Sequence, residues 1–435
     1  MNGEPSPVSV TEPAGALPSA MHLRYLALVR SNGNFRRLWL AQLVSEMGDW
    51  FYMLAIYDLL LARTHRGAAV SWAIIIQTLP WFFMTPFAGY VADRFRRRSL
   101  MITADIFRGF IVLGMLLSLV SGDVRLIYLL LGVEVIFSSL FEPARSALLP
   151  NVVSSDEILP ANALASSTWA FSLAMGAALG GAVTALMGRN FAFVTDSLSF
   201  FLSAALILRI RVHVPHAAPM RRLSESLSEA TASVREGALY LRANGKVLIL
   251  VLAKTGVGLL GGSLMLLVIF GERIFPVAGH GALAVGLLYA ARGVGAGIGP
   301  LVGDRLAGGL QLRMWNLIGA SFFVIAAAYI ALSQAPGLLL AILCILVGHM
   351  GGSNVWVMST SLLQINTPDN VRGRVFSLDF GLLMLAIAAS NYVMGLGLDT
   401  WGLTARQLAA GLGFVMTIPG ILWILGLRRF ATRAT

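Results

Sequence analysis

Twelve apolar runs, each long enough to cross a lipid bilayer, constrain the fold of this chain more than any other feature. A bilayer core about 30 Å thick is crossed by about 20 helical residues. The runs lie at about 38–62, 70–92, 99–120, 125–149, 160–187, 191–210, 247–270, 281–303, 312–333, 337–362, 373–397 and 404–427. Charged residues make up 12% of the chain, against about 25% in soluble domains. The sequence therefore predicts an all-α, multi-pass membrane protein.

The distribution of basic residues predicts the orientation in the membrane. The formal net charge is +11, and most of the 32 lysines and arginines lie at the ends of apolar runs. This pattern argues against a nucleic-acid partner, which requires a basic face on a folded domain. Cytoplasmic loops carry an excess of Lys and Arg, and placing both termini in the cytoplasm puts most of these residues inside. We therefore expect a protein embedded in the lipid bilayer of the plasma (inner) membrane with both termini cytoplasmic.

Changes in polarity along the chain predict four segments. Residues 1–34 are rich in Pro, Gly, Ser and Ala, which predicts a disordered cytoplasmic tail. Residues 35–211 and 246–435 hold six apolar runs each, and the second segment ends in a short tail. The polar connection 212–245 has a helix-forming composition over 221–242, with leucines among Ser, Glu and Arg. It predicts an amphipathic helix on the cytoplasmic membrane surface.

The two halves echo each other weakly. Ser146-Ala-Leu-Leu at the end of the fourth run matches Thr360-Ser-Leu-Leu at the end of the tenth, and Asp93-Arg94 matches Asp304-Arg305. Equivalent repeats in two halves are typical of secondary transporters. The sequence therefore predicts two pseudo-symmetric six-helix bundles around a site near the membrane midplane.

The basic loop between the second and third runs carries a specific pattern. Gly89, Asp93, Arg94, Arg97 and Arg98 form the sequence G-x-x-x-D-R-x-x-R-R. This pattern resembles the loop between helices 2 and 3 of the major facilitator superfamily. The resemblance implies a cytoplasmic gate built from these residues, a twelve-helix fold, alternating access and a single (monomeric) transport unit.

Further stretches narrow the resemblance to one branch of that superfamily. They lie at 35–40 with the pair Gly48-Asp49, at 141–150, at 159–164 and at 368–374. Together they resemble the transmembrane secretion effectors, which include enterobactin-exporter and macrolide-efflux types. The resemblance implies export of an amphipathic small molecule, either a macrolide-like drug or a siderophore-like metabolite. It also implies a proton gradient as the energy source and no cofactor.

The fifth run contains a small-residue motif with one departure from the family pattern. Drug–proton antiporters of the superfamily carry Gly-Pro-x-x-Gly-Gly here, whereas this chain has Gly176, Ala177, Gly180 and Gly181 at the corresponding positions. The glycines predict close helix packing. Because Ala177 replaces the proline, the motif leaves strict proton antiport open.

Ionisable residues within the runs are candidates for function, because each costs about 2.5–3.5 kcal/mol or more at the bilayer centre. In the first run, Gln42, Glu46, Asp49, Met53 and Tyr57 recur at helical spacing and predict a polar stripe on one face. Such a stripe must face a wet cavity or a partner. Asp49, from the Gly-Asp pair, is the first candidate for proton or substrate coupling, and Glu46 is the second.

Three other groups of charges lie in the first half. Asp105 and Arg108 are three residues apart, which predicts an intramembrane ion pair. Glu134 lies well inside the fourth run and is a further coupling candidate. Glu142 and Arg145, at the cytoplasmic end of that run, are expected to act as latches of the gate.

The second half contributes two coupling candidates with an alternative for each. Arg292 lies near the midplane, where an acid such as Asp49 or Glu134, or an anionic ligand, must compensate its charge. His349 could relay a proton, because histidine titrates near neutral pH. A hydrogen-bonded contact between helices is the alternative for His349.

Two further acids are expected to have structural roles. Asp196 lies near the outer end of the sixth run and is expected to pack against or cap a helix. Asp379 lies near Arg372 and Arg374, and we expect a salt bridge there.

Other classes of function find less support in the sequence. The six histidines show no metal-ligand spacing, so no metal site is expected. No nucleophile or carboxylate constellation at a membrane face indicates an enzyme. Two transport alternatives stay open: a lysophospholipid-handling transporter of the same fold, and a facilitator without proton coupling.

Overall fold

The computed structural model describes residues 27–154, 157–212 and 223–431. Within these ranges, the side chains at 85–90, 92–94, 159, 223–231, 233, 370 and 427–431 are outside the description. Most of the predicted N-terminal tail and part of the predicted linker therefore lie outside the described residues.

The described chain is helical throughout, with one isolated bridge between Val277 and His280. The first bundle comprises α2 (Gly33–Thr64), α3 (Gly67–Arg94), α4 (Arg97–Ser121), α5 (Val124–Leu148) with η1 (Leu149–Asn151), the segmented helix α6 (Ile158–Phe171), η2 (Ser172–Gly176) and α7 (Ala177–Met187), and α8 (Arg189–Leu208). The second bundle comprises the segmented helix α10 (Gly245–Gly258), η3 (Leu259–Gly262), α11 (Ser263–Ile269) and η4 (Phe270–Ile274), then α12 (Gly281–Ala307), α13 (Gln311–Ser333), α14 (Leu338–Asn366), α15 (Asp369–Asp399) and α16 (Ala405–Ala431). Between the bundles lies α9 (Leu223–Ala243).

The prediction of twelve membrane-crossing helices is confirmed. Eleven helices of the described chain are long and apolar enough to cross a membrane. The twelfth, α2, has 32 residues, but polar residues such as Gln42, Glu46 and Asp49 lower its hydropathy. The polarity of α2 therefore marks it as the helix whose side chains need partners inside the protein.

Local chemistry explains where helices begin and end. The side chain of Asn32 accepts a hydrogen bond from the amide of Phe35 at 2.9 Å and caps the start of α2. Asp123 caps α5 in the same way. Gly122 and Gly308 end α4 and α12 with positive φ angles of 72° and 54°, a backbone conformation that glycine adopts at little cost.

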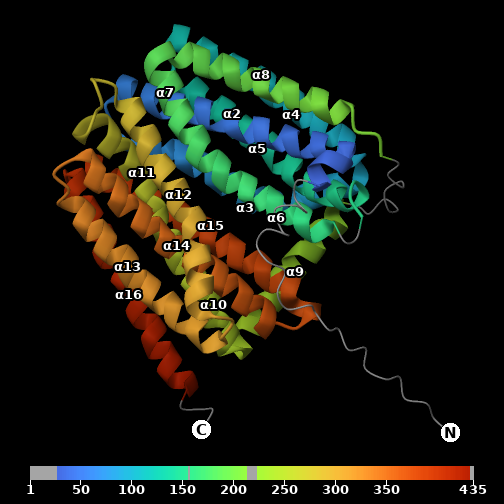
Figure 1. Cartoon of the computed structure of the whole chain (residues 1–435), viewed down its shortest axis with the longest axis vertical. Helices are drawn as coiled ribbons and strands as arrows, with labels where there is room; N and C mark the ends of the chain where they lie inside the picture. The colour runs from blue at the N-terminus through green and yellow to red at the C-terminus, as the bar shows by residue number, and fades with distance from the viewer. Residues whose placement is uncertain (1–26, 155–156, 213–222, 432–435) are drawn as a thin grey trace.

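The two bundles lie close together around α7 and α11 and diverge toward the end where α9 lies (Figure 1). We call that end the linker side and the opposite end the far side. Between the bundles, α3 packs against α15 and α7 packs against α12. Within the first bundle α2 and α4 both pack against α8, and within the second α14 packs against α12 and α13.

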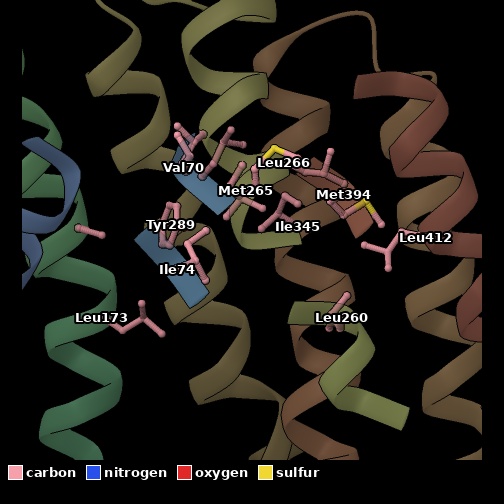
Figure 2. Close-up of a cluster of buried hydrophobic side chains, with 14 of the residues drawn as sticks. Val70, Ile74, Leu173, Leu260, Met265, Leu266, Tyr289, Ile345, Met394 and Leu412 are labelled. Carbon is pink, nitrogen blue, oxygen red and sulfur yellow. The ribbon is translucent and has the colours of Figure 1, made fainter. Parts of the chain in front are cut away.

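A buried apolar cluster crosses the boundary between the bundles. Figure 2 shows Val70 and Ile74 of α3 near Met265 and Leu266 of α11 and Tyr289 of α12. All five side chains are buried. Removing these apolar side chains from water favours the conformation in which the bundles meet.

Polar contacts also join the bundles on the far side. The carboxylate of Asp399, at the end of α15, accepts hydrogen bonds from the amides of Gly67 and Ala68 at 3.1 and 2.7 Å. These amides begin α3, and a helix N-terminus favours an anion. Arg273 of the second bundle donates to the carbonyl of His65 at 2.8 Å. Charge and dipole interactions therefore hold the far side closed.

The linker helix docks on the second bundle. Sequence predicts a helix over 221–242, and α9 spans Leu223–Ala243. Glu236 lies 2.6 Å from Arg374 of α15, and a Cβ atom at Gly237 would lie 2.8 Å from the side chain of Leu378. This contact ties the connection between the bundles to the linker-side end of α15.

Small residues allow α7 and α12 to approach closely. A Cβ atom at Gly181 would lie 2.6 Å from the carbonyl oxygen of Ala282 and 2.8 Å from the Cα atom of Gly286. A larger residue at Gly181 must therefore separate the two bundles.

We expect Gly181→Leu to destabilise the far-side-closed protein by about 1–3 kcal/mol, because overpacking moves backbone. Gly411→Leu is the matched control, since no atom lies within 4 Å of a Cβ at Gly411. Thermal unfolding of both purified variants measures the difference. Equal midpoints for Gly181→Leu, Gly411→Leu and the wild type would contradict the packing argument.

Candidate functional site

Arg108 of α4 is the centre of a buried charged cluster in the first bundle. Its Nε atom lies 2.7 Å from Oε1 of Glu134 on α5, and a terminal nitrogen lies 2.9 Å from Oδ1 of Asp49 on α2. Its guanidinium also lies 4.0 Å from the ring centre of Phe200 on α8. Tyr52 donates to the second oxygen of Glu134 at 3.0 Å. One arginine therefore connects four helices.

Two more carboxyl groups belong to the same cluster. Asp105 lies 3.7 Å from Arg108, as the three-residue spacing predicts, and accepts a hydrogen bond from Ser203 at 2.6 Å. Asp196 of α8 accepts a hydrogen bond from Ser199 at 3.2 Å. Asp105 and Asp196 are both fully buried. The second oxygen of Asp196 has no hydrogen-bond partner among the described residues.

Asp196 packs against another helix, as one of the two sequence-based roles states, and this contact places it beside the charged cluster. Asp196 lies against Gly48, because a Cβ atom there would be 2.4 Å from its Oδ1 atom and 2.1 Å from Oγ of Ser199. Gly48 directly precedes Asp49, and the close packing of α8 explains why a glycine stands at this position. The glycine lets α8 bring a fourth carboxyl group next to α2.

The cluster holds more acids than its cation can neutralise. Arg108 carries one positive charge, whereas Asp49, Asp105, Glu134 and Asp196 would carry four negative charges if all were ionised. Burying an unpaired carboxylate is strongly unfavourable, and such a group is more stable when it holds a proton. The arrangement can therefore store protons inside the first bundle.

An aromatic contact joins the two bundles next to this cluster. The ring of Trp50 lies 5.6 Å from that of Tyr289 on α12, and Tyr57 lies 6.4 Å from the same ring. The hydroxyl of Tyr57 donates to Gln77 of α3 at 2.7 Å. The polar stripe of α2 thus splits: Asp49 faces the first bundle, and Tyr57 faces the boundary.

Arg292 and His349 lie on the second bundle's side of the boundary. Arg292 stacks 5.8 Å from the ring of Tyr289 and has Tyr57, Tyr289 and Tyr329 as electrostatic neighbours. Its predicted acidic partners, Asp49 and Glu134, bind Arg108 instead.

The sequence offered two roles for His349, a proton relay or a contact between helices. The hydroxyl of Tyr329 on α13 lies 3.2 Å from Nε2 of His349. This contact joins α13 to α14, and a relay role for His349 stays a prediction.

Sequence reasoning missed the main ion pair of the second bundle. Lys254 of α10 lies 2.5 Å from Asp379 of α15, and both side chains are buried. Lys254 also donates to Thr360 at 2.8 Å. The expected pairing of Asp379 with Arg372 or Arg374 is wrong, because these arginines bind Asp369 and Glu236. The partners are 125 residues apart in the chain, and no local spacing indicates them.

A second polar group lies toward the linker side of the cluster. Gln42 donates to Glu46 at 2.7 Å and accepts from Arg145 at 3.1 Å. Arg145 lies 2.8 Å from Glu142, one turn away on α5. In this conformation these residues bind within the first bundle, and their latch role stays a prediction.

The described gate arginines also bind within the first bundle. Arg97 donates to the carbonyl of Ala147 at 2.7 Å and to Asn151 at 3.1 Å. Arg98 donates to the carbonyls of Ile207 and Leu208 at the end of α8. The side chains of the other gate residues, Gly89, Asp93 and Arg94, lie outside the described residues.

The glycines of the helix 5 motif serve close packing on two sides. A Cβ atom at Gly176 would lie 2.8 Å from the indole of Trp50, and one at Gly180 would lie 2.8 Å from the Trp50 carbonyl. Gly181 meets α12, as described above. The π-helical turn η2 directly precedes Ala177, and such turns often occur at functional sites.

No group of three His, Cys, Asp or Glu side chains within the described ranges is arranged to hold a metal ion.

Two six-helix bundles, with buried charges beside their boundary, define a major facilitator transporter. The chain belongs to the transmembrane secretion effector family, whose model matches residues 26–431. The relatives of this chain are named as transporters of the major facilitator type, some of them as exporters, which points away from an enzyme.

Named relatives cover most of the chain. BacE of Bacillus subtilis (strain 168), a putative bacilysin exporter, is 26% identical over 382 residues, which are 83% of this chain and 90% of that protein. The enterobactin exporter EntS of Citrobacter koseri is 24% identical over 414 residues, 93% of this chain and 95% of that protein. YfiS of Bacillus subtilis (strain 168) is 28% identical over 218 residues, and the match spans about half of each chain, 49% and 51%.

Solved structures support the fold. An auto-inhibited POT family peptide transporter matches with a TM-score of 0.70 and 14% identity, over 91% of this chain and 97% of that chain. A bacterial homologue of ferroportin in its inward-facing state matches with a TM-score of 0.66 and 16% identity, over 90% and 98%.

We expect Arg108→Gln to lower stability by about 3–5 kcal/mol, because it leaves buried carboxylates without their cation. Adding Glu134→Gln should recover part of this loss, since it removes one of those charges. Thermal unfolding of the single and double variants in detergent measures both effects. A single variant as stable as the wild type would show that the cluster does not depend on Arg108.

Proposed function

We propose that this protein exports an amphipathic small molecule across the plasma membrane by alternating access, driven by the proton gradient. The export of bacilysin and enterobactin named for its relatives supports a small-molecule substrate, either drug-like or siderophore-like. In this proposal the transporter works as a monomer without a cofactor, with both termini in the cytoplasm. Residues 1–211 rock against residues 246–435 around the boundary of the bundles.

The position of Asp49 carries this proposal. Its side chain is 31% exposed, whereas that of its partner Arg108 is 4% exposed. Asp49 is thus the accessible end of an otherwise buried cluster, and the next residue in the chain, Trp50, contacts the second bundle. A proton that binds to or leaves Asp49 changes its attraction to Arg108, which connects four helices.

The arrangement of the two bundles is consistent with the proposed alternating access. Asp399, Arg273 and the Gly181–Gly286 contact hold the far side closed, while the bundles diverge toward the linker side. In our proposal the linker side is cytoplasmic, so this conformation accepts substrate from the cell. Protonation of the cluster and binding of substrate then favour opposite conformations, as exchange across a membrane requires.

We expect Asp49→Asn to abolish gradient-driven export while the protein is still made and folded, because the amide cannot exchange the proton. Asp123→Asn is the matched control, since asparagine caps a helix as well as aspartate. Proton release from energised inverted vesicles measures the effect, with lipophilic cations, macrolides, siderophores and lysolipids as test compounds.

The same assay separates the alternatives. Full activity of Asp49→Asn would remove this residue from coupling and favour a facilitator without proton coupling. A response to lysolipids alone would favour a lipid-handling transporter.

We expect Arg97→Ala to slow turnover with little change in substrate affinity, because it releases the loop after α3 from the end of α5. Asp93→Ala should behave in the same way if the gate motif works as the family resemblance implies. Initial transport rates over a range of substrate concentrations separate the two quantities. A variant with altered affinity and normal maximal rate would contradict a gate role.

A further inference from the structure

Arg292 is a charged residue in the middle of the membrane whose counter-charge is missing from the described chain. It lies eleven residues into α12, which places it about 17 Å from the far-side end of that helix. A guanidinium at this depth is unfavourable unless a partner, a ligand or water compensates it. The identity of that partner therefore matters for function.

The other buried cations of the membrane region have acidic partners. Arg108 binds Asp49 and Glu134, and Lys254 binds Asp379. Arg292 forms no ion pair and no hydrogen bond with any residue that the structure describes. Its guanidinium lies 5.8 Å from the centre of the Tyr289 ring. Among the described residues, therefore, no acid pairs with Arg292.

The surroundings of Arg292 are neutral and aromatic. Its electrostatic neighbours are three tyrosines, Tyr57, Tyr289 and Tyr329. Its charge also interacts with His349. None of these groups is an anion at neutral pH. The described neighbours of the guanidinium therefore do not neutralise its positive charge.

The location also suits a ligand with an apolar body. Tyr289 contacts Trp50 from the opposite bundle, and Arg292 lies one helical turn from Tyr289 toward the linker side. The bundles diverge on that side (Figure 1). Arg292 therefore lies on the linker side of the closed aromatic contact between Trp50 and Tyr289.

We propose that Arg292 binds a carboxylate group of the exported molecule, whose apolar body lies against Trp50, which is partly exposed. A guanidinium matches a carboxylate through two parallel hydrogen bonds, which gives both affinity and orientation. The inference rests on the proposed export function and adds the chemical class of substrate, an amphipathic carboxylate.

Binding of matched probes to the purified protein in detergent tests this inference. The probes are dansyl-L-phenylalanine and dansylglycine, each compared with its neutral amide, and energy transfer from tryptophan to dansyl reports binding. The variants are Arg292→Gln and Arg292→Lys. Arg305→Gln is the control, because it removes an exposed arginine from the linker-side end of the same helix.

We expect the wild type and Arg305→Gln to bind the acids about ten- to a hundredfold more tightly than the amides, the range for a hydrogen-bonded charge pair. Arg292→Gln should lose this preference while its affinity for the amides changes little. Arg292→Lys should retain part of it, because the charge remains without the two-pronged geometry. Circular dichroism and gel filtration confirm that each variant is folded.

Equal binding of acid and amide by the wild type would overturn the inference, as would binding of neither. A preference that survives in Arg292→Gln would overturn it too, and equal loss of both probes would make Arg292 a structural residue. Because this assay needs no gradient, it is independent of the proposed export. Selective binding without export from energised vesicles would reject the export function alone, and export of acid and amide at equal rates would reject the carboxylate site alone.

Discussion

The gathering of four carboxyl groups, three of them buried, around a single arginine is the constraint on which the first bundle depends. Arg108 pairs closely with Asp49 and Glu134, whereas Asp105 and Asp196 accept hydrogen bonds from serine hydroxyl groups. The interaction links α2, α4, α5 and α8, and a change at any one carboxyl group alters the attraction among all four helices. A proton bound here therefore acts on the packing of the bundle as a whole.

The interactions at the boundary between the bundles differ from the ion pairs inside the first bundle. Apolar side chains, the ring of Tyr289 and close contacts between glycines hold it together, with Asp399 and Arg273 on the far side. Such contacts are broken and formed again without leaving a buried charge unpaired. Charges thus stabilise the interior of each bundle, and the boundary is free to open.

The sequence predicted the helices and the family well, because membrane-length runs and the Gly89–Arg98 motif are local signals. It also predicted the Asp105–Arg108 contact, since three residues bring side chains together on any helix. It could not predict that Glu134 and Asp49 bind Arg108, that Lys254 binds Asp379, or that Asp196 joins the cluster. These contacts depend on how the helices rotate and pack. Gly48 was the available signal for Asp196, because a glycine inside a polar helix indicates close approach of another helix.

Infrared difference spectroscopy of the purified transporter at neutral pH, in H₂O and in D₂O, tests the central claim most directly. A protonated carboxyl group absorbs apart from a carboxylate, and its band shifts on deuteration. We predict such a band in the wild type, weakened in Asp196→Asn and Asp49→Asn and unchanged in Asp123→Asn. A wild-type spectrum without this band, or one that neither cluster variant alters, would mean that the cluster holds no proton and would contradict the account.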